Sequence, residues 1–220
     1  VLFRSLPAQT LSYSIVGGAD AAKFSINAST GALSFVTAPN YESPTDAGGN
    51  NVYDVTVQVS DGSLTSTQTI AVTVTPVNDN TPAITSSATA SLAENTTAVL
   101  TVTATDADLP AQTLSYSIVG GADAAKFSIN STTGALSFVT APDYEAPTDA
   151  GADNTYDVTV QVSDGTLTST QAIAVTVTRV NDNTPAITSS ATASVAENST
   201  AVLTVTATDA DLPAQTLTYS

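Results

Sequence analysis

Two short stretches of the chain carry an unusual density of oxygen-bearing side chains. The first runs Val77-Asn78-Asp79-Asn80-Thr81-Pro82, and it returns as Val180-Asn181-Asp182-Asn183-Thr184-Pro185, at a spacing of 181 − 78 = 103 residues. Each stretch contains a proline and lies between runs of alternating apolar residues, which is typical of a short, stiff linker and not of a buried core. Carboxylate and amide oxygens grouped in this way are ligands for a hard cation.

Further acids flank the two linkers at matched offsets, and they are Glu94, Asp106, Asp108, Asp143 and Glu145. Calcium takes six to eight oxygen ligands at about 2.3–2.6 Å, from carboxylates, amide carbonyls and backbone carbonyls. The chain has no cysteine and no histidine, so it offers neither a thiolate zinc site nor the commonest transition-metal ligand. The residue types and their spacing therefore predict calcium as the cofactor.

The same spacing organises the whole chain. Residues 6–14 read LPAQTLSYS, residues 109–117 repeat this sequence unchanged, and residues 212–220 differ from it only at Thr218. We predict one complete repeat at 78–180, a partial repeat at 6–77 that lacks its start, and a partial repeat at 181–220 that lacks its end. Residues 1–5 match no later copy, and we interpret them as foreign, adapter-derived sequence.

The composition excludes several classes of partner. Twenty Asp and Glu against four Lys and Arg give a formal net charge of −16. Nucleic acid and anionic membranes require Lys and Arg to neutralise phosphates, so we expect neither as a partner. The sequence contains no apolar run of 18 residues or more and no visible signal peptide.

Strands must position these acids, because the complete repeat alternates apolar and polar residues with period two almost throughout. A broken first strand is expected at 83–85 and 89–92, and the others at 98–105, around 114–118, around 127–129 and 136–138, and in a hairpin of 158–162 with 173–177 across Asp164-Gly165. No segment has a helical apolar period. The prediction is an all-β fold: tandem seven-stranded antiparallel Greek-key β-sandwiches of immunoglobulin-like type, stacked head to tail.

This topology brings the acids to the two poles of the sandwich. Asp106, Asp108 and Asp164 follow strands that run toward one pole, while Glu94, Asp143 and Glu145 precede strands that start at the other, beside the outgoing linker. Head-to-tail stacking would then gather the acids of one repeat, the linker and the acids of the next repeat into one cluster. The long connection from residue 140 to residue 155 is far longer than the usual about 4–6 residues, which favours a binding role for it.

The motifs in this order resemble the cadherin-like repeats of large bacterial surface proteins. The resemblance rests on Ala93-Glu94-Asn95, Asp106-Ala107-Asp108, Asp143-Tyr144-Glu145, Ser163-Asp164-Gly165 and the Asn-Asp-Asn-x-Pro linker, and it covers essentially everything after residue 5. It implies calcium ligands at two junctions. The first junction would use Glu42, Asn78, Asp79, Asn80, Asp106, Asp108 and Asp164 with the Val77 carbonyl; the second would use Glu94, Asp143, Glu145, Asn181, Asp182, Asn183, Asp209 and Asp211 with the Val180 carbonyl.

The chain departs from the family pattern at three positions. Pro76 and Arg179 replace the aspartate that usually begins the linker, so we expect two ions at each junction in preference to three. Asn40 stands where the complete repeat has Asp143, which lowers the ligand charge at the first junction.

Several acids have a plainer interpretation. We expect Asp20, Asp54, Asp123 and Asp157 to lie on a solvated surface. The segment from Asp149 to Asn154 could be an extra calcium loop, but a plain turn is favoured, because the first copy has one acid fewer there. Paired carboxylates can hydrolyse glycosides, yet no tryptophan and no histidine base accompany these acids, so we predict no enzyme.

The function predicted from the sequence is a calcium-binding structural and adhesion repeat. It would form a rigid rod in a long secreted or surface-anchored protein, with calcium ions and the neighbouring repeats of the chain as partners and an extracellular or cell-surface location. The alternative is that the repeats themselves bind a glycan or a like repeat in homophilic cell adhesion.

Overall fold

The structure is a computed structural model of the chain, and it describes residues 9–220. The predicted foreign segment 1–5 lies outside these residues. The described chain forms two compact units: residues 9–80 with 107–112, and residues 81–106 with 113–220. None of the helices in the described part reaches the length and apolar character that a membrane span needs.

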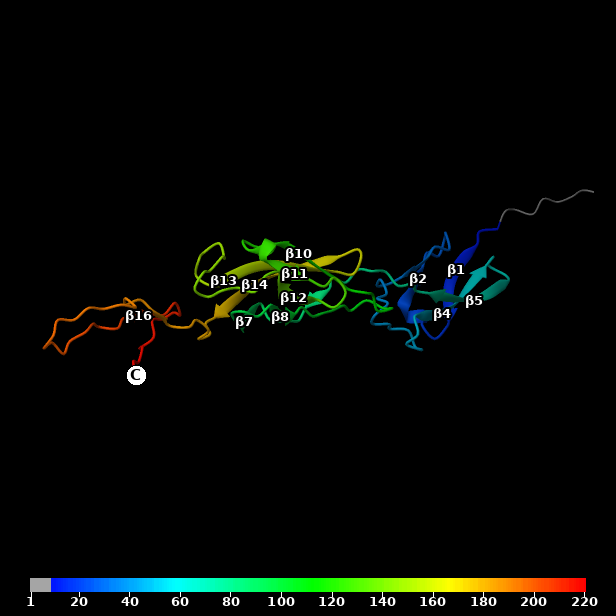
Figure 1. Cartoon of the computed structure of the whole chain (residues 1–220). Coiled ribbons are helices and arrows are strands. Elements are labelled where there is room, and N and C mark those ends of the chain that lie inside the picture. Colours follow the sequence, from blue (N-terminus) through cyan, green and yellow to red (C-terminus); the bar gives the residue numbers. More distant parts are fainter. Residues whose placement is uncertain (1–8) are drawn as a thin grey trace, which may run out of the picture. The chain divides into compact units, whose positions relative to one another are not determined.

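The second unit contains most of the predicted complete repeat, namely residues 81–106 and 113–180, and it folds as the predicted β-sandwich (Figure 1). One sheet has the order β10-β13-β14-β7 and another the order β11-β12-β8, with a short β6-β9 pair beside them. The strands are β6 (Ala83–Ile84), β7 (Thr89–Ala93), β8 (Ala98–Thr101), β9 (Ala104–Thr105), β10 (Ser115–Gly120), β11 (Phe127–Ile129), β12 (Ala135–Phe138), β13 (Thr155–Ser163) and β14 (Thr168–Thr178). The first and second predicted strands are each broken into two pieces.

One pairing differs from the predicted all-antiparallel arrangement. β7 pairs with β14 in parallel, with Ala90 opposite Val175, whereas β13 pairs with β14 in antiparallel register. Alternation of apolar residues determines which face of a strand is buried, but it is the same for a strand that runs parallel or antiparallel to its neighbour. The sequence pattern therefore could not predict this parallel pairing.

The core lies between the sheets of this unit. Inward-facing residues of β13 and β14 are almost fully buried, among them Val158, Val160, Ile173 and Val175, each at 1% exposure or less. Phe127 and Phe138 stack with their ring centroids 4.4 Å apart. Tyr156 meets the Phe138 ring edge-on at 5.0 Å, a favourable geometry for aromatic pairs.

A glycine turn joins β11 to β12. Gly134 has φ +71°, and a Cβ at this position would lie 2.2 Å from the carbonyl oxygen of Val102. The close approach lies next to the β8–β12 pairing, because the Val102 N–H donates to the Gly134 carbonyl at 2.8 Å just beyond the paired residues Thr101 and Ala135. Glycine is therefore required at this position for its backbone conformation and for its lack of a side chain.

The first unit holds the later strands of a repeat. β1 (Ser12–Gly17), β4 (Val52–Ser60) and β5 (Thr65–Thr73) form one sheet, while β2 (Phe24–Ile26) pairs with β3 (Leu33–Phe35). Phe24, Tyr53 and Val55 make a small buried cluster. The pairing β15 (Ala186–Ile187) with β16 (Ala207–Thr208) in the second unit completes the strands, and single 3-10 turns at Ala21–Lys23 and Ala124–Lys126 are the helical elements described.

Candidate metal sites

Glu94 is a buried carboxylate at the end of β7. It is 2% exposed, and its two oxygens accept backbone N–H groups from Tyr144 at 2.7 Å and Val180 at 2.6 Å. The side chain therefore ties the long connection and the start of the linker to β7. Glu94, Asp143 and Glu145 each offer a carboxylate oxygen within 4.8 Å of the others, as the sequence predicted.

Glu145 also belongs to a second group of three acids, with Asp182 of the linker and Asp211. One of its oxygens, Oε1, accepts the Leu212 N–H at 3.1 Å. The other, Oε2, is shielded from solvent and has no hydrogen-bond partner among the described residues. Asp143 fixes the local turn, because its Oδ1 accepts the N–H groups of Glu145 at 2.9 Å and Ala146 at 3.2 Å.

Asp211 anchors the linker from its other side. It is 2% exposed, and its Oδ1 accepts the Asn183 N–H at 3.2 Å and the Asn183 side-chain amide at 2.9 Å. The amide of Asn183 lowers the pKa of Asp211; burial opposes this shift, and the backbone N–H groups of Asn183 and Asp182 reinforce it. Asp209 lies beside it, and its Oδ1 accepts the Asp211 N–H at 3.0 Å.

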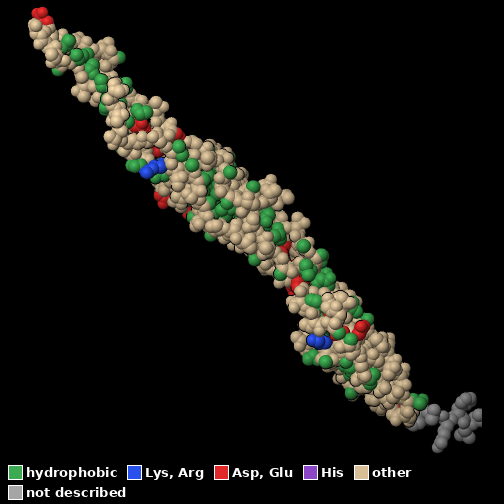
Figure 2. All heavy atoms as spheres, turned by 90° about the horizontal axis from the view of Figure 1, so that it is seen from below, with side chains coloured by type: hydrophobic (Ala, Val, Ile, Leu, Met, Phe, Trp, Pro, Cys, Tyr) green, Lys and Arg blue, Asp and Glu red, His purple; other side chains and the backbone are tan. Residues whose placement is uncertain are grey.

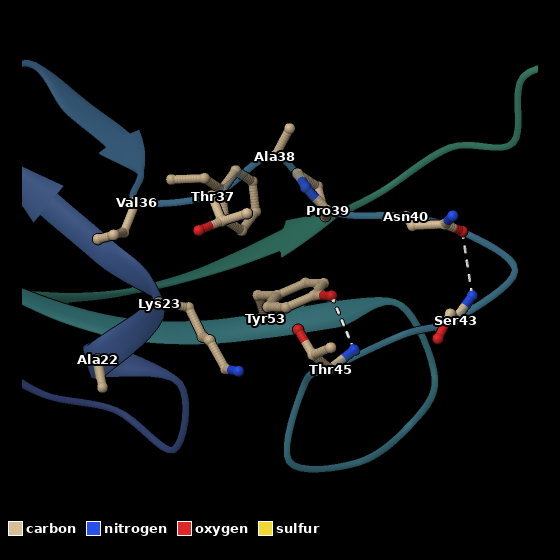
Figure 3. Close-up of a pocket in the computed structure, with 11 residues that line it drawn as sticks. Ala22, Lys23, Val36, Thr37, Ala38, Pro39, Asn40, Ser43, Thr45 and Tyr53 are labelled. Atoms are coloured by element: carbon tan, nitrogen blue, oxygen red, sulfur yellow. Dashed lines mark hydrogen bonds between the residues drawn. The ribbon is translucent and has the colours of Figure 1, made fainter.

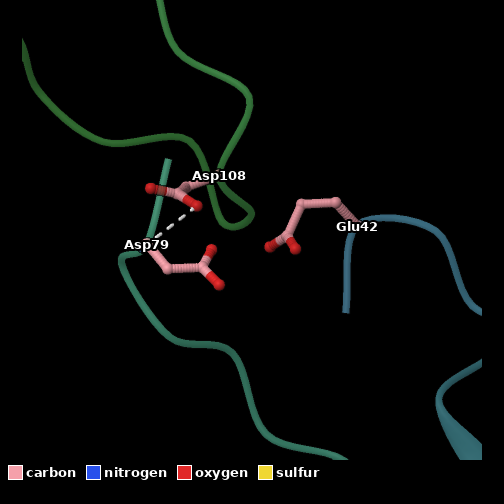
Figure 4. Close-up of side chains that lie close together, drawn as sticks. All are labelled: Glu42, Asp79 and Asp108. Carbon is pink, nitrogen blue, oxygen red and sulfur yellow. Dashed lines mark hydrogen bonds between the residues drawn. The ribbon is translucent and has the colours of Figure 1, made fainter. Parts of the chain in front are cut away.

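The first unit repeats this arrangement with Glu42, Asp79 and Asp108, whose carboxylates point toward one another (Figure 4). Asp108 is 2% exposed and accepts the Asn80 N–H at 3.2 Å and the Asn80 side-chain amide at 2.6 Å. Glu42 accepts the Leu109 N–H at 3.4 Å. Asn40 makes the same turn as Asp143, with its Oδ1 accepting the Glu42 N–H at 2.8 Å.

The remaining predicted ligands are also located. Asp106 and Asp164, both in the second unit, have carboxylate oxygens within 4.8 Å of each other. Asp164 also closes the β13–β14 hairpin, because its Oδ1 accepts the Thr166 and Leu167 N–H groups at 2.7 Å each. Asn78 and Asn181 direct their amide groups to glutamines.

Three amide residues that were not predicted as site residues hydrogen-bond to predicted ligands, and they are Gln112, Gln215 and Asn95. Asn78 donates to Gln112 Oε1 at 2.7 Å, and Asn181 donates to Gln215 Oε1 at 3.0 Å. The Asn95 side-chain amide donates to Asp182. The two glutamines lie 34 residues after their asparagines, so this recurring offset was the available signal. The Asn78 Oδ1 is buried without a hydrogen-bond partner among the described residues and is left as a potential ligand.

Ten of the twenty acids of the chain belong to these groups. Figure 2 shows the acidic side chains in a few small groups on a surface that is otherwise mostly uncharged. Two carboxylates about 4 Å apart repel by roughly 1 kcal/mol in water and roughly 4 kcal/mol near a protein surface. A group of three at this spacing therefore favours a bound divalent cation, and its all-oxygen donors suit calcium.

Two acids predicted to be solvated are instead buried. Asp123 is 4% exposed, and it accepts the Ala150 N–H at 2.7 Å and the Asp157 N–H at 2.8 Å, while Asp20 makes the same two bonds in the first unit. The prediction was wrong because a 3-10 turn places each carboxylate under the long connection, where backbone amides satisfy it. Asp54 is half-buried and Asp157 exposed.

The segment from Asp149 to Asn154 is a turn whose backbone N–H groups hydrogen-bond to the Asp149 carboxylate. The sequence favoured a plain turn over a calcium loop at this position. Asp149 accepts the Asp153 N–H at 2.9 Å and the Asn154 N–H at 3.1 Å. Burial raises the pKa of Asp149, but these backbone hydrogen bonds outweigh it and the net pKa lies below the ordinary value. Both oxygens are thus occupied by N–H groups.

A cleft of about 580 Å³ lies beside Tyr53 in the first unit (Figure 3). The Tyr53 hydroxyl accepts the Thr45 N–H at 3.1 Å at one side of it, and Lys23 lines it as the charged residue. A similar cleft of about 430 Å³ surrounds Tyr156 in the second unit, with Asp143 in place of Asn40. Asp143 is the one carboxylate that lines the second cleft and none lines the first, so neither cleft is itself a group of acids.

Comparison with known proteins identifies the domain type. Residues 88–178 match the Cadherin domain family. The chain is 34% identical to human protocadherin Fat 1 over 186 residues, covering 80% of this chain and 4% of that protein, and 32% identical to mouse protocadherin Fat 4 over 212 residues, covering 92% and 4%. A crystal structure of mouse cadherin-23 EC22-24 superimposes with a TM-score of 0.64 at 26% identity, covering 92% of this chain and 66% of that one.

These matches confirm the predicted fold and the predicted extracellular or cell-surface location. The chain spans about 4% of the length of the two protocadherins. The relatives are human and mouse proteins, so they give no support to the bacterial subtype expected from the sequence. By its sequence match and its fold, the part of the chain from residue 88 to residue 178 is a cadherin domain.

Proposed function

We propose that the chain is a calcium-binding structural and adhesion repeat, in which ions held at each linker stiffen successive repeats into a rod. The ligands would be the acids and amides predicted from the sequence, including the Glu42, Asp79 and Asp108 group and the two groups that share Glu145. The role is structural and not enzymatic. Extracellular modules bind calcium at about 10⁻⁴–10⁻³ M, and we expect affinities in this range.

The environment of Glu145 carries the proposal. Its carboxylate is common to two groups of three acids, and its Oε2 is buried without a hydrogen bond among the described residues. A buried carboxylate oxygen is costly unless a donor or a cation satisfies it. One carboxylate shared by two acidic groups is the geometry of a ligand that bridges two neighbouring ions, which agrees with the expectation of two ions at each junction.

Calorimetric titration of the chain with calcium tests this function. We expect binding that Glu145→Gln weakens at least tenfold, because the substitution removes one charge from both groups. Asp157→Asn serves as the matched control, since it removes the same charge from an exposed position on β13. Equal affinities for the two variants would overturn the assignment of Glu145 as a ligand.

The proposed stiffening has its own readout. Small-angle scattering of an array of several complete repeats should give a longer maximum dimension in calcium than in chelator, because unneutralised carboxylates repel. Equal dimensions would contradict the rod while leaving calcium binding intact.

Like repeats are the partner we propose for any direct adhesive contact. A solved structure 28% identical to this chain, covering 94% of it, is a protocadherin gammaB7 EC3-6 cis-dimer. The glycan alternative has no comparable support. Beads coated with intact repeats should aggregate in calcium if like repeats associate. No aggregation in that assay, together with no binding on a glycan array, would identify the repeats as a spacer without an adhesive contact of their own.

A further inference from the structure

Asn154 holds the backbone between two candidate calcium ligands. Its side-chain amide donates to the Tyr144 carbonyl at 2.9 Å, and Tyr144 lies between Asp143 and Glu145 in the sequence. The Tyr144 N–H donates to the Glu94 carboxylate at 2.7 Å. Both main-chain groups of Tyr144 are therefore fixed, one by a candidate ligand and the other by a residue that is not itself a predicted ligand.

Asn154 is in turn anchored to the sheet, where it directly precedes β13. Its carbonyl accepts the Val177 N–H of β14 at 2.9 Å, and its own N–H donates to the Asp149 carboxylate at 3.1 Å. The residue is 9% exposed. Its side-chain amide therefore connects the turn that carries the ligands to a buried part of the sandwich.

The local geometry explains why this position holds an asparagine. Asn154 has φ +64°, in the left-handed region where asparagine is tolerated better than most residues with a side chain. Its Oδ1 is shielded from solvent and has no hydrogen-bond partner among the described residues. A buried amide oxygen without a partner lowers stability. Unfavourable features of this kind gather at functional sites, which directs attention to what the other end of the amide does.

The first unit contains the same contact. Asn51 donates to the Tyr41 carbonyl at 2.9 Å, directly before the candidate ligand Glu42, and its Oδ1 is likewise buried without a partner in the described part of the chain. The backbone of Asn51 is again left-handed, with φ +63°. Four of the ten residues at 43–52 differ from those at 146–155, so the contact is kept while the segment around it changes.

We propose that Asn154 is a positioning residue for calcium, which fixes the turn of Asp143 and Glu145 through the Tyr144 carbonyl before an ion binds. Its counterpart in the first unit has the same role there. The inference rests on the calcium binding proposed for the chain. Ordering a flexible turn costs conformational entropy, and a turn that is already held incurs this cost on folding and not on ion binding. The long connection 140–155 thus raises the affinity of ligands that it also carries.

Calorimetric titration of the chain with Asn154→Gly tests the inference. Glycine adopts a left-handed backbone without strain, so the substitution removes the amide and keeps the course of the chain. We expect calcium binding to weaken about tenfold, which is the effect of one buried hydrogen bond on an equilibrium constant. Ala152→Gly is the matched control, since Ala152 has φ +52° in the same segment and its substitution removes no hydrogen-bonding side chain. It should leave the affinity unchanged.

A double-mutant cycle with Glu145→Gln shows whether Asn154 acts through the ligand turn. Residues that act through one network are not additive, so Asn154→Gly should weaken binding by less than about threefold in the Glu145→Gln chain. Losses that simply add would overturn the positioning role. An unmodified chain that binds no calcium would overturn the proposed function and this inference with it. Affinity that Glu145→Gln lowers and Asn154→Gly leaves unchanged would overturn the inference alone.

Hydrogen exchange in chelator supplies a readout that needs no ion. Asn154→Gly should speed exchange of the Tyr144 N–H about tenfold, because the turn opens more often once its carbonyl is released. Asp123→Ala removes a buried acceptor from the same connection but leaves both contacts of Tyr144 in place, so this exchange rate should not change. An unchanged rate in Asn154→Gly would overturn the proposal. Equal increases in both variants would also overturn it, because they would reflect a general loss of stability.

Discussion

Glu94 accepts the backbone N–H of Val180 at 2.6 Å, although the two residues lie 86 positions apart in the sequence. The same carboxylate accepts the Tyr144 N–H. A residue predicted only as a calcium ligand thus also holds the linker and the long connection against β7. Removing metal and removing this side chain should therefore have different consequences.

Glu94→Ala should lower the free energy of unfolding of the chain by about 2–4 kcal/mol even in chelator, because two backbone donors lose their acceptor in a buried place. Chemical denaturation in chelator measures this loss. Glu94→Gln, which keeps a side-chain acceptor, should cost less. Equal stability of Glu94→Ala and the unmodified chain in chelator would show that the carboxylate acts through metal alone.

Asp123→Ala separates a structural acid from a metal ligand. We expect a loss of about 2–4 kcal/mol in unfolding free energy, because the Ala150 and Asp157 N–H groups lose their buried acceptor. Calcium affinity measured by calorimetry should stay unchanged. The exposed Asp157 is the control, since Asp157→Ala should change neither quantity. A marked fall in calcium affinity on Asp123→Ala would contradict the assignment.

Asn40→Asp should tighten calcium binding in the first unit. The substitution adds a carboxylate to the turn that positions Glu42. The second unit already has an aspartate at the equivalent position, Asp143. An added charge at about 4 Å from a divalent ion contributes roughly 1–2 kcal/mol, or about five- to thirtyfold in affinity. Calorimetric titration measures this gain. Asn50→Asp adds the same charge in a remote loop, where the complete repeat already has Asp153, and should have a much smaller effect.

Asp149 should make stability depend on pH in the acid range. Its pKa is lowered in the folded chain below the ordinary value of 3.8, since its backbone hydrogen bonds favour the charged form. Its contribution is therefore fully present above the unfolded pKa and is lost as the pH falls through the folded pKa. Asp149→Asn should flatten the slope of unfolding free energy against pH below about pH 4, while leaving the slope near neutrality unchanged. Denaturation at a series of pH values gives both slopes, and an unaltered acid slope would show that another group dominates.

The strands of the complete repeat were predictable because their apolar residues alternate with polar ones. Val158, Val160 and Val162 all lie on the same face of β13, and that face is buried. The candidate ligands were predictable for a different reason: Glu42 and Glu145 recur at one offset from identical linkers. Other features depend on tertiary contacts that leave no periodic signal. The burial of Asp123 depends on a single 3-10 turn beneath the long connection, and the parallel direction of β7 depends on where the chain crosses between sheets.

Backbone N–H groups of the same unit donate hydrogen bonds to the carboxylates of Asp20, Asp46, Asp123 and Asp149. A carboxylate satisfied in this way needs no ion to be stable, so the sandwich has an internal polar scaffold that does not rely on calcium supply. The linker motifs can then vary independently of that scaffold. A protein engineer could exchange linker sequences between such repeats to set the calcium threshold of an array, while each domain keeps its own folding stability.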